Sequence, residues 1–351
     1  MQIYQNANLA PFHTFSINAK AETLIEVESI SDLQHVYQDE RWQAQPKLVL
    51  GKGSNVLFTT DYQGVVLVNR IRGIEVEEDE HCVRVYARGG EDWPELVEHV
   101  VNQGIGGLEN LALIPGCVGS SPIQNIGAYG VELKDVCEYI DYFDITTFET
   151  IRLHVSECYF GYRDSIFKHE LKSRAVIIGV GLKLAKPWTA NLSYGPLKSL
   201  GEHCSPKEVF DAVCAIRRAK LPDPEQFGNA GSFFKNPVIS AQRFTDFHRA
   251  FPDAPYYQTD EGIKLAAGWL IEQCGLKGHS IGGAKVHSEQ ALVLINEDNA
   301  SAADVIALAN HVKSRVADIF MIQLEHEVRF IGSNQETSLE ECVTEAENEG
   351  L

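Results

Sequence analysis

The chain has 351 residues and a mass of 39.0 kDa, enough for two or three compact units that each bury a hydrophobic core. Lys and Arg total 30 and Asp and Glu total 49, giving a net charge of −19. Such a charge repels polyanions, so we expect no nucleic-acid partner. Apolar residues make up 44% of the sequence, and no apolar run approaches the roughly 18 residues that cross a bilayer, which excludes a membrane-inserted protein.

The N-terminus and the cysteines indicate where the protein works. Met1–Pro11 lacks the charged and then apolar pattern of a signal peptide, so we expect the protein in the cytoplasm. The eight cysteines are scattered, with no Cys-x-x-Cys pair. Their spacing favours neither a disulfide framework nor a zinc site, and we predict no metal site.

The first two thirds of the chain alternate short strands and helices, which is an α+β pattern. We predict strands at Leu24–Glu28, Lys47–Leu50, Val65–Val68, Val83–Arg88, Tyr139–Thr146, Thr150–Val155 and Ala175–Leu184. Helices are predicted from Ser31, as the cap, through Trp42 and from Trp93 to Val101.

A second, smaller domain follows. Ser205, Pro206 and Glu208 have the order of a helix start with a capping box, and Leu221–Pro224 punctuates the chain soon afterwards. Beyond it we predict helices at Gly262–Cys274 and Ser301–Ile319 and strands at Ala291–Asn296 and Met321–Ile331. From Gln335 to Leu351 there are six Glu and no Lys or Arg, which predicts a disordered tail.

Two loops poor in side chains stand out. Gly51–Asn55 follows a strand, and its small residues let backbone N–H groups converge on an anion. It matches neither the Walker nor the Rossmann pattern, and taken alone it reads better as a tight turn than as a ligand site. A second loop, Ile114–Pro122, also bears hydroxyl groups. Because two phosphates and a flat ring system need close backbone approach at separate places, the pair of loops favours a dinucleotide ligand.

Two polar segments could carry chemistry. Arg163, after Phe160–Gly161, could hold a carboxylate or stabilise a developing enolate, and an Arg–Asp structural pair is the alternative. Ser232 follows a glycine in a turn flanked by aromatic residues. It has no obvious His partner, which argues against hydrolysis but not against proton donation, and a plain turn is the alternative.

A third segment lies near the end of the chain. Glu325, Glu327 and Arg329 are expected on one face of a strand, where a carboxylate beside an Arg can transfer a proton and steer an anion. A solvated face is the alternative. Tyr194 and Lys220 precede proline-containing turns where a ligand cleft could be rimmed.

Taken together, these segments closely resemble the UDP-N-acetylenolpyruvoylglucosamine reductase family, the flavoenzymes of bacterial peptidoglycan synthesis. The match runs in family order from about Pro11 to Gly332, and the Tyr194 loop looks like that of the longer, type I form. The matching segments are Leu50–Phe58, Gly107–Gly130, Phe160–Lys168, Gly228–Pro237, Lys264–Ile271 and Glu327–Phe330.

The resemblance implies a fold and its cofactors. We expect an α+β chain with a two-subdomain FAD-binding fold of the vanillyl-alcohol-oxidase type, then a smaller C-terminal α/β substrate-binding domain. The predicted limits are 1–70 and 71–206 for the subdomains, 207–333 for the substrate-binding domain and 334–351 for the acidic tail. FAD would bind non-covalently, NADPH would reduce it and leave, and an enolpyruvyl UDP-sugar would then take its place. We also expect a monomer.

The resemblance further implies roles for individual residues. Arg163 and Glu327 would hold and polarise the carboxylate end of the substrate, and Ser232 would deliver the proton. FAD would be bound by Gly51, Gly53, Ser54, Asn55, Pro115, Gly116, Gly119, Ser120, Ser121, Asn125 and Gly127. Substrate or nicotinamide would be bound by Tyr162, Tyr194, Lys220, Asn236 and Gln290, with Lys220 and Asn236 assisting the proton donor.

Two other functions stay open on the residues alone. An FAD-dependent oxidase of hydroxy acids or alcohols shares the flavin fold and would consume oxygen without needing NADPH. Many such oxidases link the flavin to a His, and none lies within Gly51–Asn55 or Ile114–Ser121. A non-catalytic nucleotide-sugar binding module would bind without turnover, which the presence of Arg163, Ser232 and Glu327 disfavours.

Overall fold

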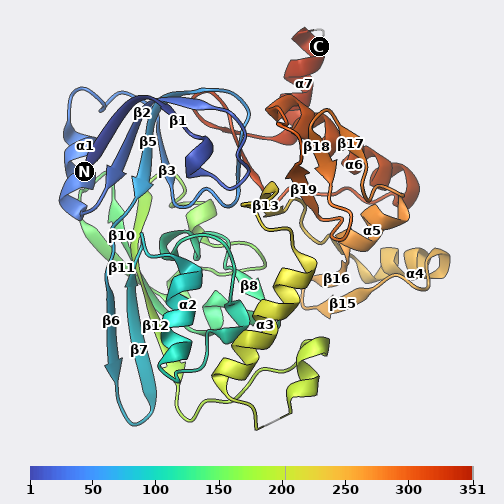
Figure 1. Ribbon diagram of the computed structural model, residues 1–351, viewed down its shortest axis with the longest axis horizontal. Helices are drawn as coiled ribbons and strands as arrows, with labels where there is room; N and C mark the ends of the chain where they lie inside the picture. Colours follow the sequence, from blue (N-terminus) through green and yellow to red (C-terminus); the bar gives the residue numbers. More distant parts are fainter. Residues whose placement is uncertain (202, 350–351) are drawn as a thin grey trace. The chain divides into compact units, whose positions relative to one another are not determined.

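The computed structural model describes residues 1–201 and 203–349, which form two compact units, each assembled from segments far apart in the sequence (Figure 1). Unit 1 comprises Met1–Gln5, Thr23–Lys52 and Gly64–Ala219. Unit 2 comprises Asn6–Glu22, Gly53–Gln63 and Lys220–Leu351. These limits differ from the predicted domains, because the chain crosses between the units several times and residues 207–219 belong to unit 1.

The largest sheet of unit 1 is antiparallel, with the strand order β11-β10-β12-β7-β6. Most of its strands coincide with predicted ones: β7 alternates in polarity, whereas β12 is a nearly continuous apolar run. The strands are β6 (Ile74–Glu78), β7 (Cys82–Arg88), β10 (Cys137–Asp144), β11 (Thr150–His154) and β12 (Ala175–Ala185).

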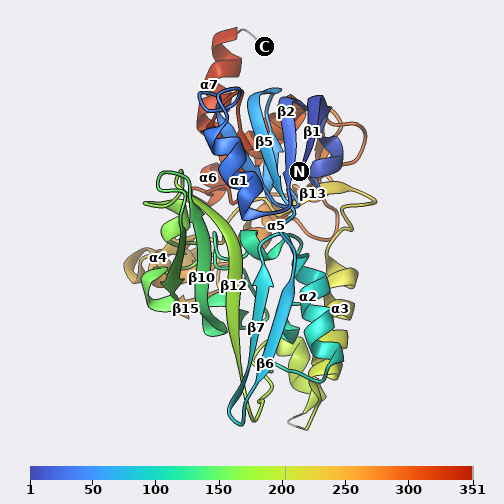
Figure 2. The ribbon, with the colours of Figure 1, turned by 90° about the vertical axis from the view of Figure 1, so that its left-hand side faces the viewer.

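Two helices, α2 (Trp93–Asn102) and α3 (Pro206–Lys220), cover one face of this sheet (Figure 2). Their apolar stripes share one core with the inward side chains of the strands. The start of α3 is the predicted capping box, since Glu208 N donates to Ser205 Oγ at 3.3 Å and Ser205 N donates to Glu208 Oε2 at 2.7 Å.

The other face of the sheet explains one glycine pair. Cβ atoms at Gly179 and Gly181 would overlap the rings of Tyr86 and Tyr139, which stack with centroids 6.0 Å apart. Arg152 lies over the Tyr139 ring at 3.6 Å. The Gly-x-Gly pair in β12 therefore makes room for these aromatic side chains.

A second sheet, most of which lies in unit 1, has the order β1-β2-β5-β3. Its strands are β1 (Gln2–Asn8), β2 (Lys20–Val27), β3 (Lys47–Leu50) and β5 (Tyr62–Asn69). Helix α1 (Ile30–Gln38) packs on it and is capped by Ser29, not by Ser31 as predicted, because Ser29 Oγ accepts from Asp32 N at 3.1 Å. Strands β8 (Gly127–Ala128) and β9 (Val131–Glu132) form a short hairpin.

Unit 2 holds three small sheets and four helices around one core. The sheet β13-β19-β18-β17 contains β13 (Gly228–Ser232), β17 (Ser280–Ile281), β18 (Ala284–Val286) and β19 (Val293–Asn296). A second sheet consists of β14 (Val238–Ile239), β16 (Gly262–Leu265) and β15 (Tyr256–Thr259). A third consists of β21 (Glu336–Thr337), β20 (Arg329–Ile331) and β4 (Val56–Phe58). The helices are α4 (Ala241–Ala250), α5 (Ala267–Gln273), α6 (Ala302–Phe320) and α7 (Leu339–Glu349).

Two predicted elements of unit 2 are wrong in extent. The helix predicted at Gly262–Cys274 is strand β16 followed by the shorter helix α5, since Gly262 has φ of +144° and the next residues pair with β15. The strand predicted at Met321–Ile331 begins only at Arg329. Met321 instead ends α6 in the left-handed conformation, with φ of +57°.

The acidic C-terminal segment is a helix through residue 349 rather than a disordered tail. Leu339 and Cys342 are buried against the core, Val343 packs beside them, and Lys313 of α6 forms an ion pair with Glu340. Positions 339, 342 and 343 have the i, i+3, i+4 spacing of an apolar helix face. The burial of this narrow stripe offsets the repulsion between the glutamates.

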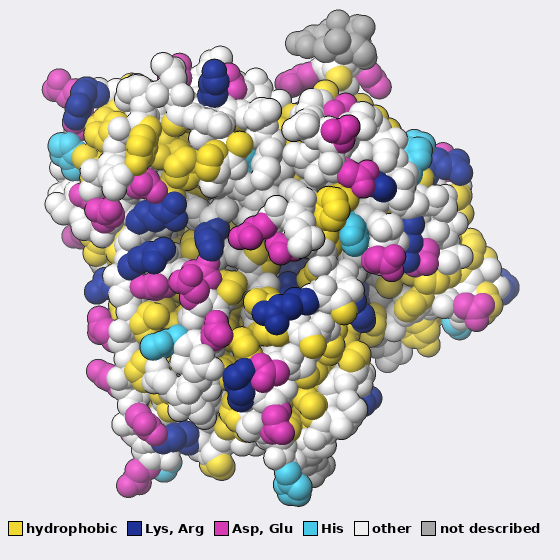
Figure 3. Space-filling view, in the orientation of Figure 1, with side chains coloured by type: hydrophobic (Ala, Val, Ile, Leu, Met, Phe, Trp, Pro, Cys, Tyr) yellow, Lys and Arg dark blue, Asp and Glu magenta, His cyan; other side chains and the backbone are white. Residues whose placement is uncertain are grey.

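One face of the surface carries charges of both signs. On the face in Figure 3, acidic and basic side chains are interspersed. Within the described residues, no helix is long and apolar enough to cross a membrane.

Candidate active site

The two predicted glycine loops touch in unit 1. A Cβ atom at Gly51 would overlap Cys117 Sγ and lie 3.8 Å from Ser120 Cβ, so the backbone of the first loop runs directly against the second. Asp92, the cap of α2, pairs with Cys117 through the backbone and forms an ion pair with Lys52. Only residues without bulky side chains allow this approach.

The second loop is held together by its own polar groups. Gly119 N donates to Gly89 O at 2.8 Å, and a Cβ at Gly119 would lie 2.9 Å from the same oxygen. The hydroxyls of Ser120 and Ser121 each donate to a carbonyl of the loop at 2.7 Å, so towards a ligand they can only accept. Burial raises the pKa of the Cys117 thiol, which keeps this side chain neutral.

The remainder of the first loop belongs to unit 2. Gly53 has φ of +61°, and a Cβ there would overlap His13, so glycine is required. Thr14 N donates to Gly53 O at 3.1 Å, and Thr14 Oγ1 donates to Asn229 O at 2.6 Å. The loop is thereby fastened to strand β13.

Asn55 joins this loop to the segment that carries Glu327, a predicted catalytic residue. Asn55 Nδ2 donates to Glu327 O at 3.2 Å, and Arg329 N donates to Asn55 O at 3.0 Å. Glu327 N in turn donates to Phe233 O at 2.8 Å, immediately after Ser232. The backbones of Ser232 and Glu327 are therefore neighbours, and both side chains are only partly buried.

A bulge at the end of β13 presents Ser232. Gly231 adopts φ of +74°, and its N–H donates to Asn229 Oδ1 at 3.0 Å. The register with β19 shifts between Asn229 and Ser232, which pairs with Val293. Bulges of this kind redirect side chains and are frequent beside active sites.

The strand predicted to carry Glu325, Glu327 and Arg329 on one face is shorter than expected. Glu325 and Glu327 precede β20, and Arg329 begins it. Glu325 forms an ion pair with Lys235 at 3.3 Å, whereas Arg329 pairs with Glu336 at 3.3 Å.

Arg163 lies in unit 1 on a strained turn. Its φ is +56°, a region that non-glycine residues seldom adopt. Arg163 Nη2 donates to Gly127 O at 3.1 Å, and the guanidinium carbon lies 5.4 Å from the centre of the Tyr162 ring. Asp164 pairs with His169 at 2.8 Å.

Two predicted substrate-binding residues meet at the start of α5. Asn236 Oδ1 accepts from Ala267 N at 2.9 Å, which leaves its amide hydrogens available for a ligand. A Cβ at Gly268 would lie 3.4 Å from Gln290 Oε1. Lys220 is exposed at the end of α3.

Tyr194 lies in a cluster that sequence reasoning missed. Its ring packs edge-on against Tyr129 with centroids 4.9 Å apart, and Arg217 lies close enough to act electrostatically on the Tyr129 hydroxyl. Burial lowers the pKa of Arg217, whose Nε has no partner within the described residues. Nothing in the sequence spacing of Arg217 points to Tyr129, because the two residues are far apart in the chain.

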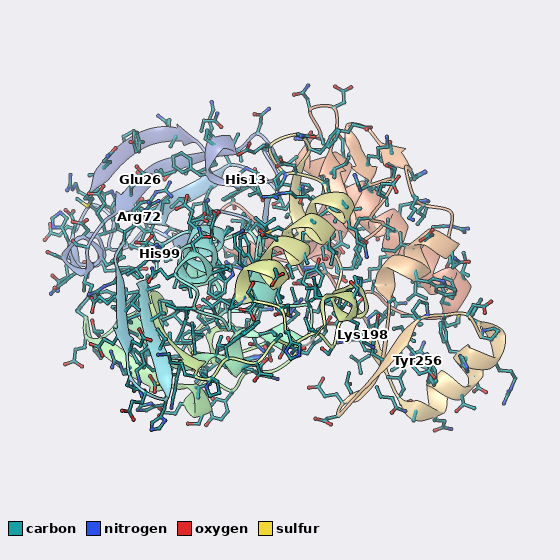
Figure 4. The ribbon with its side chains drawn as sticks, turned by 60° about the horizontal axis from the view of Figure 1, so that its bottom comes forward. His13, Glu26, Arg72, His99, Lys198 and Tyr256 are labelled. Atoms are coloured by element: carbon teal, nitrogen blue, oxygen red, sulfur yellow. The ribbon has the colours of Figure 1, made fainter. Side chains whose placement is uncertain are left out.

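His13 is a second residue that the sequence did not single out. It is 4% exposed, and its Nε2 lies 3.0 Å from Ile17 O, so the proton is on Nε2 (Figure 4). Nδ1 has no partner in the described part of the chain. Burial lowers the pKa of His13 to about 4.

These loops fit FAD. In unit 1, a Cβ at Gly51 or Gly119 would overlap or press on a neighbouring segment, so the two loops are packed on one side, while Ser120 stays partly exposed. A large ligand can therefore reach backbone and small polar groups without displacing side chains. Within residues 1–201 and 203–349, no cluster of three or more His, Cys, Asp or Glu residues could hold a metal ion.

Two family models match the chain. An FAD binding domain matches residues 21–152, and the C-terminal domain of UDP-N-acetylenolpyruvoylglucosamine reductase matches residues 223–331. The fold and the loops therefore define an FAD-dependent oxidoreductase. A relative named UDP-N-acetylenolpyruvoylglucosamine reductase from Vibrio cholerae serotype O1 is 56% identical over 98% of this chain and 99% of its own length. Another of that name from Vibrio vulnificus is 54% identical over 99% of this chain and 100% of its own length.

The chain belongs to the UDP-N-acetylenolpyruvoylglucosamine reductase family. The crystal structure of such a reductase from Thermus caldophilus, 24% identical, shares the fold with a TM-score of 0.67 over 94% of this chain and 99% of that one. The predicted fold class, the activity as an oxidoreductase and FAD as cofactor are confirmed.

Proposed function

We propose that Arg163, Ser232 and Glu327 carry out the reaction of this family in this chain. The enzyme reduces the enolpyruvyl group of UDP-N-acetylglucosamine enolpyruvate to the lactyl ether of UDP-N-acetylmuramate, a step of peptidoglycan precursor synthesis, with NADPH as electron donor. The oxidase and binding-module alternatives are not favoured, since relatives at 54% to 56% identity over nearly the whole chain are named as this reductase.

FAD, reduced by NADPH, supplies the hydride when bound. The residues that would hold it offer backbone and small polar groups: Gly51, Gly53, Ser54, Asn55, Pro115, Gly116, Gly119, Ser120, Ser121 and Gly127. The contact between Gly51 and Cys117 supports a cofactor site built from both loops in unit 1.

Charge develops at the substrate carboxylate. Hydride addition to the terminal methylene carbon of the enol ether leaves negative charge that spreads towards the carboxylate. Arg163 would face this charge, and a cation fixed in advance stabilises a developing anion without reorganisation. Its hydrogen bond to Gly127 O at 3.1 Å supports a fixed guanidinium. Glu327 would hold and polarise the carboxylate end together with Arg163.

Ser232 would deliver a proton to the carbon next to the carboxylate. An ordinary Ser hydroxyl is a weak acid, so it needs neighbours that stabilise its alkoxide or return its proton. Glu327 is attached to the residue that follows Ser232 by a backbone hydrogen bond of 2.8 Å, and this adjacency is the observation that carries the proposal. Lys220 and Asn236 would assist the proton transfer.

The remaining residues would bind the rest of the ligands. Tyr162 would contact the substrate, Tyr194 the nicotinamide or the diphosphate, and Gln290 the sugar nucleotide. The half-exposed Tyr194 ring beside Tyr129 supports a contact with a ligand. We further propose that the enzyme acts as a monomer in the cytoplasm and has no nucleic-acid partner, in keeping with its net charge of −19.

Stopped-flow kinetics of Ser232→Ala tests this assignment. Flavin reduction by NADPH should stay near the wild-type rate, while flavin reoxidation by the enolpyruvyl sugar should slow by about 100-fold or more, the scale of a lost proton donor. Ser240→Ala is the matched control, because Ser240 only caps α4 by accepting from Arg243 N. Equal losses in both half-reactions of Ser232→Ala would contradict the assignment.

A further inference from the structure

Asn125 is a buried polar residue whose side chain is engaged within unit 1. It is 0% exposed, and its Nδ2 donates to Gly161 O and to Glu132 Oε2, both at 3.0 Å. Its Oδ1 accepts from Lys134 N at 3.0 Å. Because both amide hydrogens are used, the side chain can donate nothing to a cofactor.

The bond to Gly161 fixes the turn that carries Arg163. Gly161 and Asp164 close this turn through their backbones, with Gly161 N donating to Asp164 O at 3.0 Å. A non-glycine residue with φ of +56° persists only where its surroundings hold it. Asn125 holds the turn before Arg163, and Lys168 Nζ holds Arg163 O at 2.8 Å.

The same short hairpin also receives the guanidinium. Gly127 O accepts from Arg163 Nη2 at 3.1 Å, and Gly127 pairs with Glu132 across β8 and β9. Glu132 in turn accepts from Asn125. A closed ring of contacts therefore links Asn125 to the backbone and to the side chain of Arg163.

We propose that Asn125 is a positioning residue for the reduction step, which clamps Gly161 and thereby fixes the guanidinium of Arg163. The inference rests on the proposed role of Arg163. It replaces the cofactor-binding role that the family resemblance implied for the Asn125 side chain, because a residue that acts through Arg163 affects substrate reduction and leaves FAD binding unchanged.

Both half-reactions of Asn125→Ala, Arg163→Ala and the double variant test the proposal in stopped flow. Asn125→Ala should bind FAD and accept electrons from NADPH at near wild-type levels. Reoxidation by the enolpyruvyl UDP-sugar should slow by about 10-fold to 100-fold, the scale of a small misplacement of a catalytic group. The double variant should be no slower than Arg163→Ala, since the two changes remove one function.

A matched control separates positioning from general stability. Asn69 is also buried, donating to Ile177 O at 3.0 Å and accepting from Ile71 N at 3.1 Å, but it holds no part of the Arg163 turn. Asn69→Ala should lose stability without changing the ratio of the two half-reactions. Asn125→Gly removes the same donors and tolerates the φ of +43° at this position, so it carries the same expectation as Asn125→Ala should the latter fail to fold.

The possible results distinguish failure of the positioning role of Asn125 from failure of the proposed role of Arg163. If flavin reoxidation is slow in Arg163→Ala but has the wild-type rate in the Asn125 variants, only the positioning role of Asn125 is overturned. Weaker FAD binding, equal slowing of both half-reactions, or a double variant slower than Arg163→Ala also overturns it. Unchanged reoxidation in Arg163→Ala overturns the proposed role of Arg163 and the inference with it.

Discussion

Replacing Gly51 with Ala tests the contact between the two flavin loops. The added Cβ would lie under 3.0 Å from Cys117 Sγ, closer than real Cβ atoms come, so the loops have to part by about half an ångström or more. Overpacking of this kind costs about 1–3 kcal/mol. We expect that loss in the free energy of unfolding and, because the parted loops no longer match the cofactor, at least about tenfold weaker FAD binding.

The structure also predicts the rescue. In Gly51→Ala/Cys117→Ala the sulfur is gone, and the new Cβ would lie 3.7 Å from the Cβ of residue 117, which is ordinary contact. Cys117→Ala alone removes a buried sulfur and should cost about 1 kcal/mol. The double variant should therefore bind FAD more tightly than Gly51→Ala does.

FAD titration by quenching of flavin fluorescence, with urea unfolding of each variant, measures both effects. Gly195→Ala is the matched control, because a Cβ at Gly195 meets nothing within 4 Å. Wild-type affinity and stability in Gly51→Ala, or a double variant as weak as the single one, would refute the predicted contact.

Two further predictions concern unit 2. The pKa of His13 is lowered to about 4 by burial, so between the ordinary value of 6.5 and about 4 the unfolded chain binds a proton that the folded chain does not, and stability falls as the pH is lowered through this range. The free energy of unfolding should fall by about 1.4 kcal/mol per pH unit, up to about 3 kcal/mol in total. Urea unfolding at about pH 7 and about pH 5 measures this fall, which should be smaller in His13→Gln than in the wild type. An equal fall in both proteins would contradict the burial of a neutral ring. Leu339 is 1% exposed, so Leu339→Ala should lower the free energy of unfolding by about 2–4 kcal/mol, whereas Glu345→Ala on the exposed side of α7 should change it little. Equal small effects of the two changes would mean that α7 is not packed on the core.

The sequence was most informative where the signal is local. Strand β7 follows from its alternating side chains and β12 from its apolar run, and the start of α3 follows from Ser205 and Glu208, which contact each other within one turn. Helix α7 does not follow from the sequence in this way, because its many glutamates are typical of disorder and only Leu339, Cys342 and Val343 have the spacing of an apolar helix face. Gly262–Leu265 was misread because a short apolar run suits a helix and a strand alike.

The candidate site divides in the same way. Loops rich in glycine and other small residues are visible in the sequence, so both glycine loops could be found from composition. Their contact through Gly51 and Cys117 could not, nor could the adjacency of Ser232 and Glu327, because each joins positions distant in the chain. The roles of the site residues came from the family resemblance, whereas the occupied side chain of Asn125 became apparent only from its partners.

As a reductase of this family, the chain passes electrons from NADPH to an enolpyruvyl UDP-sugar. The decisive measurement mixes the NADPH-reduced protein with UDP-N-acetylglucosamine enolpyruvate under strictly anaerobic conditions. The yellow flavin colour should return without oxygen, and mass spectrometry should find a product heavier than the substrate by two hydrogens. A colour that returns only when oxygen is admitted, with the sugar unchanged, would mean that the electrons do not reach the sugar.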